Sequence, residues 1–208
     1  VKSLHEALAE GLIVPAGKMY RFTHDRIQQA VYSLIADKDR NHAHLTIGRL
    51  LLANIPEDKR EAHLFDIVNQ WNWGKDIITD AGEKELLAGL NLEAGRKAKQ
   101  SSAFKAALEY FETGIAILKD DPWNVQYELC RNLHTEATEA AYLNGDFATM
   151  DKYYPIVLKN TRNLLEKVKP YEIRILAYKA ENKLLDAIKT GLELLKQLGE
   201  DFPSNPTM

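Results

Sequence analysis

The stretch SSAFKAALEYFETGIAIL, residues 101–118, decides the fold of this chain. Intervals of three and four residues separate its apolar side chains, and such intervals place side chains on one face of an α-helix. These apolar residues are Phe104, Ala107, Leu108, Phe111, Ile115 and Leu118. A helix with one apolar face needs a neighbour that covers it, so the stretch predicts a packed helix from about Ser102.

The pattern recurs later in the chain. In each occurrence an aromatic residue or leucine is followed three positions later by a small or adaptable residue, and four positions after that comes a third residue of the pattern. The three occurrences are Phe104-Ala107-Phe111, Phe147-Met150-Tyr154 and Leu184-Ala187-Gly191. The segments before them carry small or compact patches: Ala94-Gly95-Ala98, Ala137-Thr138-Ala141 and the looser Arg174-Ile175-Tyr178. Small side chains let two helices approach closely, and large ones fill the space towards the next pair. The sequence therefore predicts antiparallel helix pairs that stack on one another.

Helical patterns extend over most of the chain after residue 37. Asp80 and Glu83 have capping-box spacing, and Asp121-Pro122 has the form of an N-cap followed by proline. Gly145 lies in a tight turn and is expected to be left-handed. The remaining helices are expected at residues 41–54, 60–73, 122–143, 171–181 and 184–198, the last with Leu184, Ile188, Leu195 and Leu198 on one side.

The first 36 residues have a different pattern. Residues 3–10 predict a short helix, and the β-prone residues 12–14 and 20–23 flank a Pro-Ala-Gly-Lys turn, which predicts a hairpin. An amphipathic helix follows from Asp25, with Thr23 able to cap it and Asp25 in its first turn. Helix, hairpin and helix in this order are typical of the last part of a winged-helix domain.

The helix pairs of residues 84–198 resemble tetratricopeptide repeats. Equivalent positions lie 43 residues apart (107 to 150) and then 37 apart (150 to 187), against about 34 in that family, and the family's tryptophan and terminal proline are missing. We therefore expect an all-α fold, a tetratricopeptide-like solenoid of antiparallel helix pairs with elongated helices. A short N-terminal helix and a β-hairpin, the remnant of a winged helix, precede it.

A second resemblance covers nearly the whole chain. It rests on Leu4-x-x-Ala7-Leu8-x-x-Gly11-Leu12-Ile13, on Tyr20-x-Phe22-x-His24-Asp25-Arg26-Ile27-Gln28-Gln29-Ala30-x-Tyr32, and on the later runs 91–99, 107–110, 140–147 and 171–173. These resemble the end of the predicted ATPase module, and the helical region after it, in large bacterial multi-sensor histidine kinases and hybrid serine/threonine kinases of the STAND class of NTPases. The resemblance implies a nucleotide-binding core that ends in a winged helix, then a helical-repeat sensor, then output modules.

The same resemblance implies a role for His24 and Asp25. In the wider class, a His-Asp pair at this place contacts the β-phosphate of the bound nucleotide, and His24 matches that histidine. The hypothesis is that His24 senses the nucleotide state of the intact protein, which would bind ATP or ADP, whereas this segment itself holds no cofactor. The alternative is that His24 only caps or packs against the hairpin.

Two modules are therefore expected: residues 1–36, the C-terminal part of a winged-helix-like module, and residues 37–208, a tetratricopeptide-like repeat domain. Val1 in place of an initiator methionine, and the turn-rich residues 201–206, suggest a segment excised from a larger protein. With 27 basic and 30 acidic residues, neither nucleic acid nor a membrane surface is an expected partner. The lone Cys130 fits a reducing compartment, so a cytoplasmic location is expected.

The chain shows no recognisable catalytic motif. Gly11 and Gly17 are separated by five residues instead of the four of a phosphate loop, and Met19 replaces its Ser or Thr. On a helix His42 and His44 point about 200° apart, so they cannot share a metal ion and are interpreted as a solvated pair. We expect no catalytic residue and no metal site.

Candidate interaction residues are Trp73 and Trp123, because exposed tryptophans dominate many interfaces. Their alternative role is repeat packing, and Trp71 continues an apolar stripe. The run Arg96-Lys97-x-Lys99 is interpreted as a solvated helix face. The leading hypothesis is a non-catalytic segment of a sensor kinase that couples a protein partner or small-molecule signal to neighbouring ATPase and kinase modules. The alternatives are the sensor of a STAND-type transcription regulator, a small helical enzyme and a DNA-binding winged helix.

Overall fold

The computed structural model describes residues 2–17, 19–118, 122–200 and 202, and most of them are helical. The N-terminal elements are α1 (Lys2–Ala9), β1 (Ile13–Ala16), β2 (Met19–Phe22) and α2 (Asp25–Ser33). They are followed by α3 (Asp37–Asn54), η1 (Glu57–His63), α4 (Leu64–Trp73), η2 (Lys75–Ile77), α5 (Ala81–Gln100), α6 (Phe104–Ile117), α7 (Pro122–Val125), α8 (Tyr127–Leu143), α9 (Phe147–Asn160), α10 (Leu165–Ala180) and α11 (Leu184–Gln197). The predicted helical class and the hairpin are confirmed.

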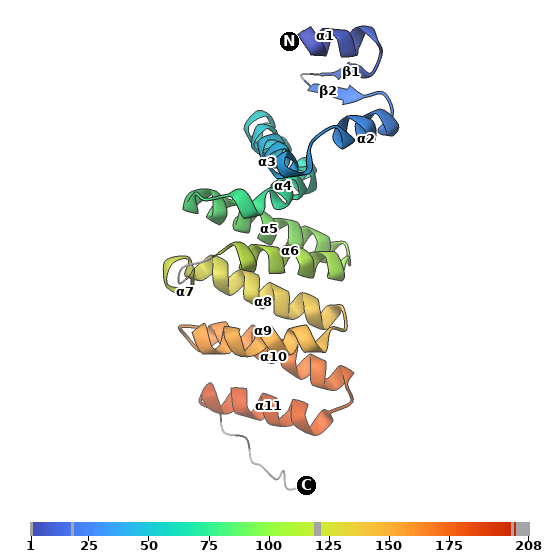
Figure 1. The fold of residues 1–208 in the computed structure, drawn as a ribbon. Helices are drawn as coiled ribbons and strands as arrows, with labels where there is room; N and C mark the ends of the chain where they lie inside the picture. Colours follow the sequence, from blue (N-terminus) through green and yellow to red (C-terminus); the bar gives the residue numbers. More distant parts are fainter. Residues whose placement is uncertain (1, 18, 119–121, 201, 203–208) are drawn as a thin grey trace.

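The helices form an elongated stack (Figure 1). Short turns join α5 to α6, α8 to α9 and α10 to α11, and the two helices of each of these pairs pack along their lengths. The first helices of the pairs, α5, α8 and α10, also contact one another in sequence. At one end of the stack, α1, the hairpin and α2 project beyond α3, and α11 forms the other end. Among the described helices, none combines the length and apolarity that crossing a bilayer requires.

The close contact within the α5–α6 pair depends on a glycine. A Cβ atom added to Gly95 would lie 2.3 Å from Cε1 of Phe111, whose side chain is fully buried. A similar contact joins α6 to α8, since a Cβ on Gly114 would lie 2.7 Å from Cδ2 of Leu133. Ala137 and Ala141 of α8 are fully buried. The prediction that small patches bring paired helices together is confirmed for Gly95 in the α5–α6 pair.

Trp71 fixes the pairing of α3 with α4. Its side chain is only 2% exposed, and it lies against Gly48, where an added Cβ would stand 1.7 Å from Cδ1 of the indole. The predicted stripe through Trp71 is therefore confirmed. Gly48 is the small residue that its ring requires.

Two asparagines join α4 to α5. Asn72 and Asn91 exchange side-chain hydrogen bonds, each amide nitrogen donating to the other carbonyl oxygen at 2.9 Å. The Asn91 amide also donates to the Leu87 carbonyl oxygen at 2.9 Å, and Asn91 is fully buried. Buried amides are stable only when their hydrogen bonds are made, so this pair fixes how α4 lies along α5.

Four expected helices have different boundaries. The one expected at residues 41–54 begins earlier, at Asp37. The helix expected at residues 60–73 is a 3₁₀ helix up to His63 and an α-helix only from Leu64. The one expected at 122–143 is broken at Gln126, whose φ and ψ of −129° and 48° are not helical; Asp121 lies outside the described residues. The one expected from Tyr171 begins at Leu165 and includes Pro170. Its early start has a local cause, since Asn163 Oδ1 accepts from the Glu166 amide at 3.1 Å.

The capping predictions are confirmed in part. Asp80 Oδ1 accepts from the Glu83 amide at 2.8 Å, but the Glu83 carboxylate binds Arg49 instead of returning to the cap. Thr23 does not cap α2. Its hydroxyl donates to the Gly11 carbonyl oxygen at 2.9 Å, so it ties the turn after α1 to the hairpin. Gly145 has a φ of 73°, as predicted.

Substitution of Gly95 by leucine tests the close contact with Phe111. We expect Gly95→Leu to lower the free energy of unfolding by about 3 kcal/mol, because the new side chain overpacks a filled core. Gly89→Leu is the matched control on the same helix, where an added Cβ meets nothing within 4 Å, and it should stabilise by about 0.5–1 kcal/mol. Urea unfolding followed by circular dichroism measures both, and equal effects would contradict this role of Gly95.

Candidate functional site

A cluster of polar and aromatic side chains lies where the N-terminal elements meet the stack. This junction cluster comprises Tyr32 of α2, Arg40 and His44 of α3, and Gln70 and Trp73 of α4. His44 Nδ1 lies 2.7 Å from Gln70 Oε1, and His44 Nε2 lies 3.1 Å from the Tyr32 hydroxyl. The Arg40 guanidinium lies 5.1 Å from the centre of the Tyr32 ring.

The chemistry of the cluster fixes its hydrogen-bond directions. Gln70 Oε1 can only accept, so His44 Nδ1 carries the proton, and in the neutral ring Nε2 accepts from the Tyr32 hydroxyl. One imidazole therefore connects α2, α3 and α4. The interpretation of His44 as solvated is wrong, because the residue is half-buried and both of its ring nitrogens have side-chain partners. His42 is exposed, as expected.

Trp73 gives the junction cluster an open aromatic surface. Its ring stacks on His44 with centroids 5.6 Å apart and planes 22° apart, yet the residue remains 64% exposed. One face of the indole is thus held by the protein while much of the ring faces solvent. This geometry suits the predicted interaction role, which stays a prediction.

Trp123 lies in a different environment. It packs on the edge of the main core, with its ring 4.9 Å from His134 and 6.1 Å from Tyr127 between centroids. Burial lowers the pKa of His134, whose Nδ1 pairs with the Cys130 carbonyl oxygen at 2.8 Å. Trp123 packs against this buried histidine, so much of the Trp123 side chain contacts the protein itself.

His24 and Asp25 lie between the hairpin and α2. His24 is the N-cap residue of α2 but makes no side-chain cap hydrogen bond, and Asp25 lies in the first turn of the helix. Both side chains are exposed. The fold therefore leaves them accessible, and their nucleotide-sensing role stays a prediction.

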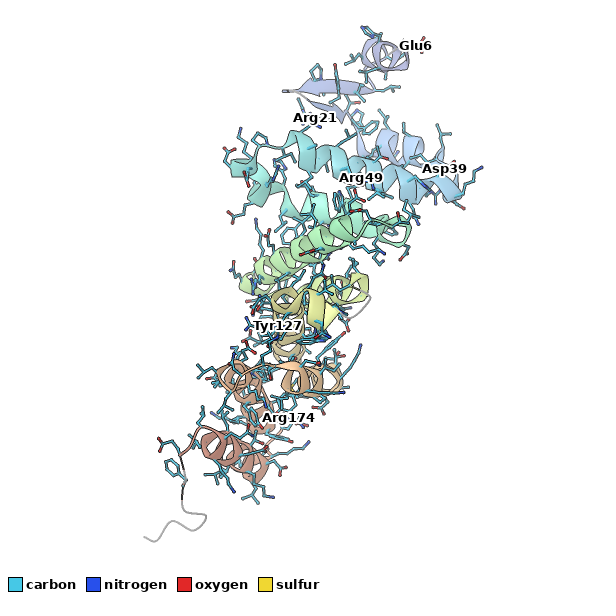
Figure 2. The ribbon with its side chains drawn as sticks, turned by 90° about the vertical axis from the view of Figure 1, so that its left-hand side faces the viewer. Glu6, Arg21, Asp39, Arg49, Tyr127 and Arg174 are labelled. Carbon is cyan, nitrogen blue, oxygen red and sulfur yellow. The ribbon has the colours of Figure 1, made fainter. Side chains whose placement is uncertain are left out.

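A groove of about 850 Å³ opens between α3, η1, α4 and α5. Along this groove α3 packs on α4, and α4 packs on α5, while α3 hardly contacts α5. Arg49 bridges the boundary through a bidentate pair with Glu83, at 2.8 and 2.6 Å, and Figure 2 shows Arg49 at this level of the stack. Apolar, basic and acidic side chains line the groove. The apolar ones are Leu52, Leu64, Ile67, Trp71, Leu86 and Leu90, the basic ones are Arg49, Arg60, Arg96 and Lys97, and the acidic ones are Glu57, Glu61 and Glu93.

Ion pairs connect the first helices of the three following pairs. Lys99 of α5 donates to Glu136 and Glu139 of α8, each at 2.5 Å. Glu139 also pairs with Lys169 of α10 at 2.6 Å, and Arg96 pairs with Glu136 at 2.8 Å. Burial raises the pKa of Glu139, but its bonds to the two lysines outweigh this and hold the pKa below its usual value. Arg96 and Lys99 are thus bound across helices. The assignment to a solvated face is wrong for Lys99, whose side chain is 20% exposed, whereas the Arg96 side chain is 44% exposed.

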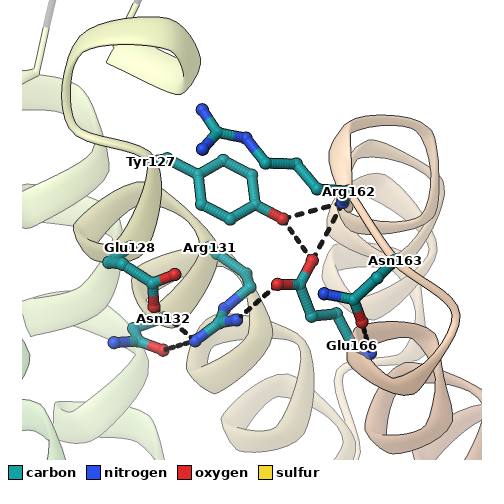
Figure 3. A network of polar contacts seen from close by, with 7 residues as sticks. All are labelled: Tyr127, Glu128, Arg131, Asn132, Arg162, Asn163 and Glu166. Atoms are coloured by element: carbon teal, nitrogen blue, oxygen red, sulfur yellow. Dashed lines mark hydrogen bonds and ion pairs between the residues drawn. The ribbon is translucent and has the colours of Figure 1, made fainter.

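A polar network fastens the α9–α10 turn to the start of α8 (Figure 3). Glu166 Oε1 accepts from Arg131 at 2.9 Å, and Glu166 Oε2 accepts from the Arg162 amide at 2.9 Å and from the Tyr127 hydroxyl. The Arg162 guanidinium lies 3.8 Å from the centre of the Tyr127 ring. Burial raises the pKa of Glu166, but the hydrogen bonds to the carboxylate lower it by more, so the pKa of Glu166 lies below its usual value.

In the part of the chain that the structure describes, no group of His, Cys, Asp and Glu residues could hold a metal ion. The cysteine thiol of Cys130 is buried, which raises its pKa to about 11, so it is not an activated nucleophile. What these residues offer is a set of surfaces: the junction cluster, the groove and the ion-paired face of α5, α8 and α10.

Comparison with known proteins gives one informative similarity. In an alignment of 213 positions that covers 91% of the chain, it is 29% identical to the hybrid signal transduction histidine kinase G of Dictyostelium discoideum. It spans about 6% of the length of that relative. No family model matches the chain, and no solved structure matches it. The similarity therefore relates this helical chain to a small part of a signal-transduction kinase.

Replacing Glu166 by glutamine tests the network of Figure 3. We expect Glu166→Gln to lower the free energy of unfolding by about 1–3 kcal/mol at pH 7, because hydrogen bonds to a largely buried carboxylate are lost. Since the folded pKa is depressed, the wild-type contribution is present above the unfolded pKa, about 4.3, and is lost as the pH falls through the folded pKa. The difference between the two proteins should therefore shrink in acid.

Glu128→Gln is the control for this measurement. Glu128 binds the same arginine, Arg131, but its side chain is 68% exposed, so the change should cost at most about 1 kcal/mol. Denaturant unfolding between pH 7 and pH 3 measures all three proteins. A Glu166→Gln effect that is equally large at both ends of this range would contradict the role of the ionised carboxylate.

Proposed function

We propose that the chain is a non-catalytic regulatory segment of a large cytoplasmic signal-transduction kinase. The observation that carries this proposal is the similarity to a hybrid signal transduction histidine kinase over 91% of the chain. The helical stack supports it, since stacked helix pairs offer long surfaces for binding instead of an enclosed reaction site. The segment would bind a protein partner or a small-molecule signal.

We infer that the pairs α5–α6, α8–α9 and α10–α11 are tetratricopeptide-like repeats. The support is the close contact of Gly95 with Phe111 within the α5–α6 pair and of Gly114 with Leu133 between α6 and α8. Residues 1–36 would be the end of a winged-helix module of an ATPase. A helix, a two-stranded antiparallel hairpin and a second helix occur there in the required order.

The proposed mechanism is coupling through the junction cluster. His44 hydrogen-bonds to Tyr32 of α2 and to Gln70 of α4, so a change in the tilt of the first helix pair would move α2. His24 begins α2, and in the parent protein it would contact ATP or ADP in the neighbouring ATPase module. Allostery requires two sites that are linked by one structural element, and each site must shift the equilibrium between the states of that element.

The test uses the intact kinase that contains this segment. We expect His44→Ala to change the rate of autophosphorylation by about fivefold or more, because allosteric coupling is typically worth about 1–3 kcal/mol. His42→Ala is the matched control on the same helix, since the His42 side chain is exposed and should leave the rate unchanged. Identical rates for both variants and the wild type would count against a regulatory role of the junction.

The nucleotide role of His24 has a separate test. His24→Ala in the intact kinase should weaken ADP binding, measured by titration calorimetry, while His42→Ala should not. Since the His24 side chain is exposed in this segment, the fold should survive the change. Equal ADP affinities would remove His24 from the mechanism without affecting the proposal for the junction cluster.

A further inference from the structure

The groove between α3, η1, α4 and α5 has the size and the lining of a binding site. Its volume of about 850 Å³ falls within the range of ligand-binding clefts, about 300–1,000 Å³. Its apolar lining includes the buried Leu64, Ile67 and Trp71 and the more accessible Leu86 and Leu90 of α5. Leu86 is 45% exposed, so a ligand in the groove would cover apolar surface that water now reaches.

Two contacts fix how the walls of the groove lie side by side. Arg49 of α3 binds Glu83 of α5, and the Lys97 ammonium of α5 donates to the Glu61 carbonyl oxygen of η1 at 2.5 Å. The paired residues are 34 and 36 positions apart in the sequence, so the two walls run in the same direction. The contacts lie about 20 Å apart along α5, because a helix rises about 1.5 Å per residue.

The acidic side chains of the groove have no partners in the fold. Glu57, Glu61 and Glu93 are exposed, and no residue that the structure describes donates to their carboxylates. By the register of the two walls, Glu57 on one side lies at about the level of Glu93 on the other. Two carboxylates without partners therefore flank the apolar lining from opposite walls.

The basic side chains of the groove, by contrast, are already bound. Arg49 and Arg96 bind carboxylates that lie outside the groove lining. Arg60 and Lys97 donate to backbone carbonyl oxygens. A cationic ligand would meet three carboxylates with free acceptor positions, whereas an anionic ligand would have to share cations that have partners. The charges of the groove therefore favour a cation.

We propose that the groove binds an amphipathic α-helix of a partner protein that carries lysine or arginine beside its apolar face. A helix of this kind lays its apolar side chains into a groove. These side chains would cover Leu86 and Leu90, and the basic side chains would pair with Glu57 and Glu93. A helix of about 14 residues would span the 20 Å or so between the two wall contacts.

The inference rests on the proposed regulatory function in taking a protein as the partner. Binding of a helix by this chain can nevertheless be measured without any kinase activity. Loss of the groove as a binding site would leave the tests on the intact kinase unaffected, and failure of those tests would leave helix binding standing.

The first experiment titrates the chain with a synthetic helical peptide of about 14 residues, which has leucines on one face and lysines along both edges of that face. A second peptide with glutamate in place of every lysine is the matched control. Titration calorimetry should give the lysine peptide a dissociation constant about tenfold lower than that of the glutamate peptide, because only the lysines meet carboxylates without partners. Equal affinities, or no binding of the lysine peptide, would overturn the proposal.

The second experiment places the lysine peptide in the groove. Replacing Glu57 and Glu93 together by glutamine should weaken its binding by about tenfold, since two ion pairs are lost. Replacing Glu85 and Glu172 together by glutamine is the control, because both are exposed and lie outside the groove lining and the net charge changes equally. The same loss in both double variants would reduce the binding to general charge attraction and overturn the proposal.

A third pair of variants tests the apolar contact. Leu86→Ser should weaken binding of the lysine peptide by about fivefold, because apolar surface that the peptide covers is removed. Leu50→Ser is the matched control on α3, since Leu50 is 56% exposed and lies outside the groove lining, and it should leave the affinity unchanged. Circular dichroism verifies that each variant is folded. An affinity that Leu86→Ser does not change would place the peptide elsewhere on the chain and rule out the groove.

Discussion

The approach of Phe111 to Gly95 is the contact on which the rest of the stack depends. It brings α6 onto α5 at a distance that no residue with a side chain would allow. That distance places Phe111 in the main core together with Leu133 and Ala137 of α8, and α8 then lies within reach of Lys99. The ion-paired face is therefore a consequence of a backbone contact made by a residue without a side chain.

The order of the helices could be predicted because it depends on local periodicity. Phe104, Phe111 and Trp71 belong to stripes that are visible in the sequence, and small residues mark the places where helices meet. The start of α10 could not be predicted in this way. Pro170 normally indicates a helix beginning, but a cap at Asn163 and the bonds of Glu166 begin the helix earlier.

The candidate site was less accessible to sequence reasoning. The partners of Lys99 are 37 and 40 residues away, and those of His44 are 12 and 26 residues away, so no short motif contains them. Trp73 could be singled out because it falls outside the stripe of Trp71. The groove is lined by residues of α3, η1, α4 and α5, and how these elements pack is a property that a one-dimensional pattern does not record.

The reciprocal amide pair of Asn72 and Asn91 has a consequence for how the first helix pair can move. Sliding α4 by one turn along α5 would separate the half-buried Asn72 from the buried Asn91 and leave the Asn91 amide without this partner, at a cost of about 1–3 kcal/mol. The pair therefore fixes the register of α4 on α5, and the bidentate contact of Arg49 with Glu83 is a second link between the first helix pair and α5.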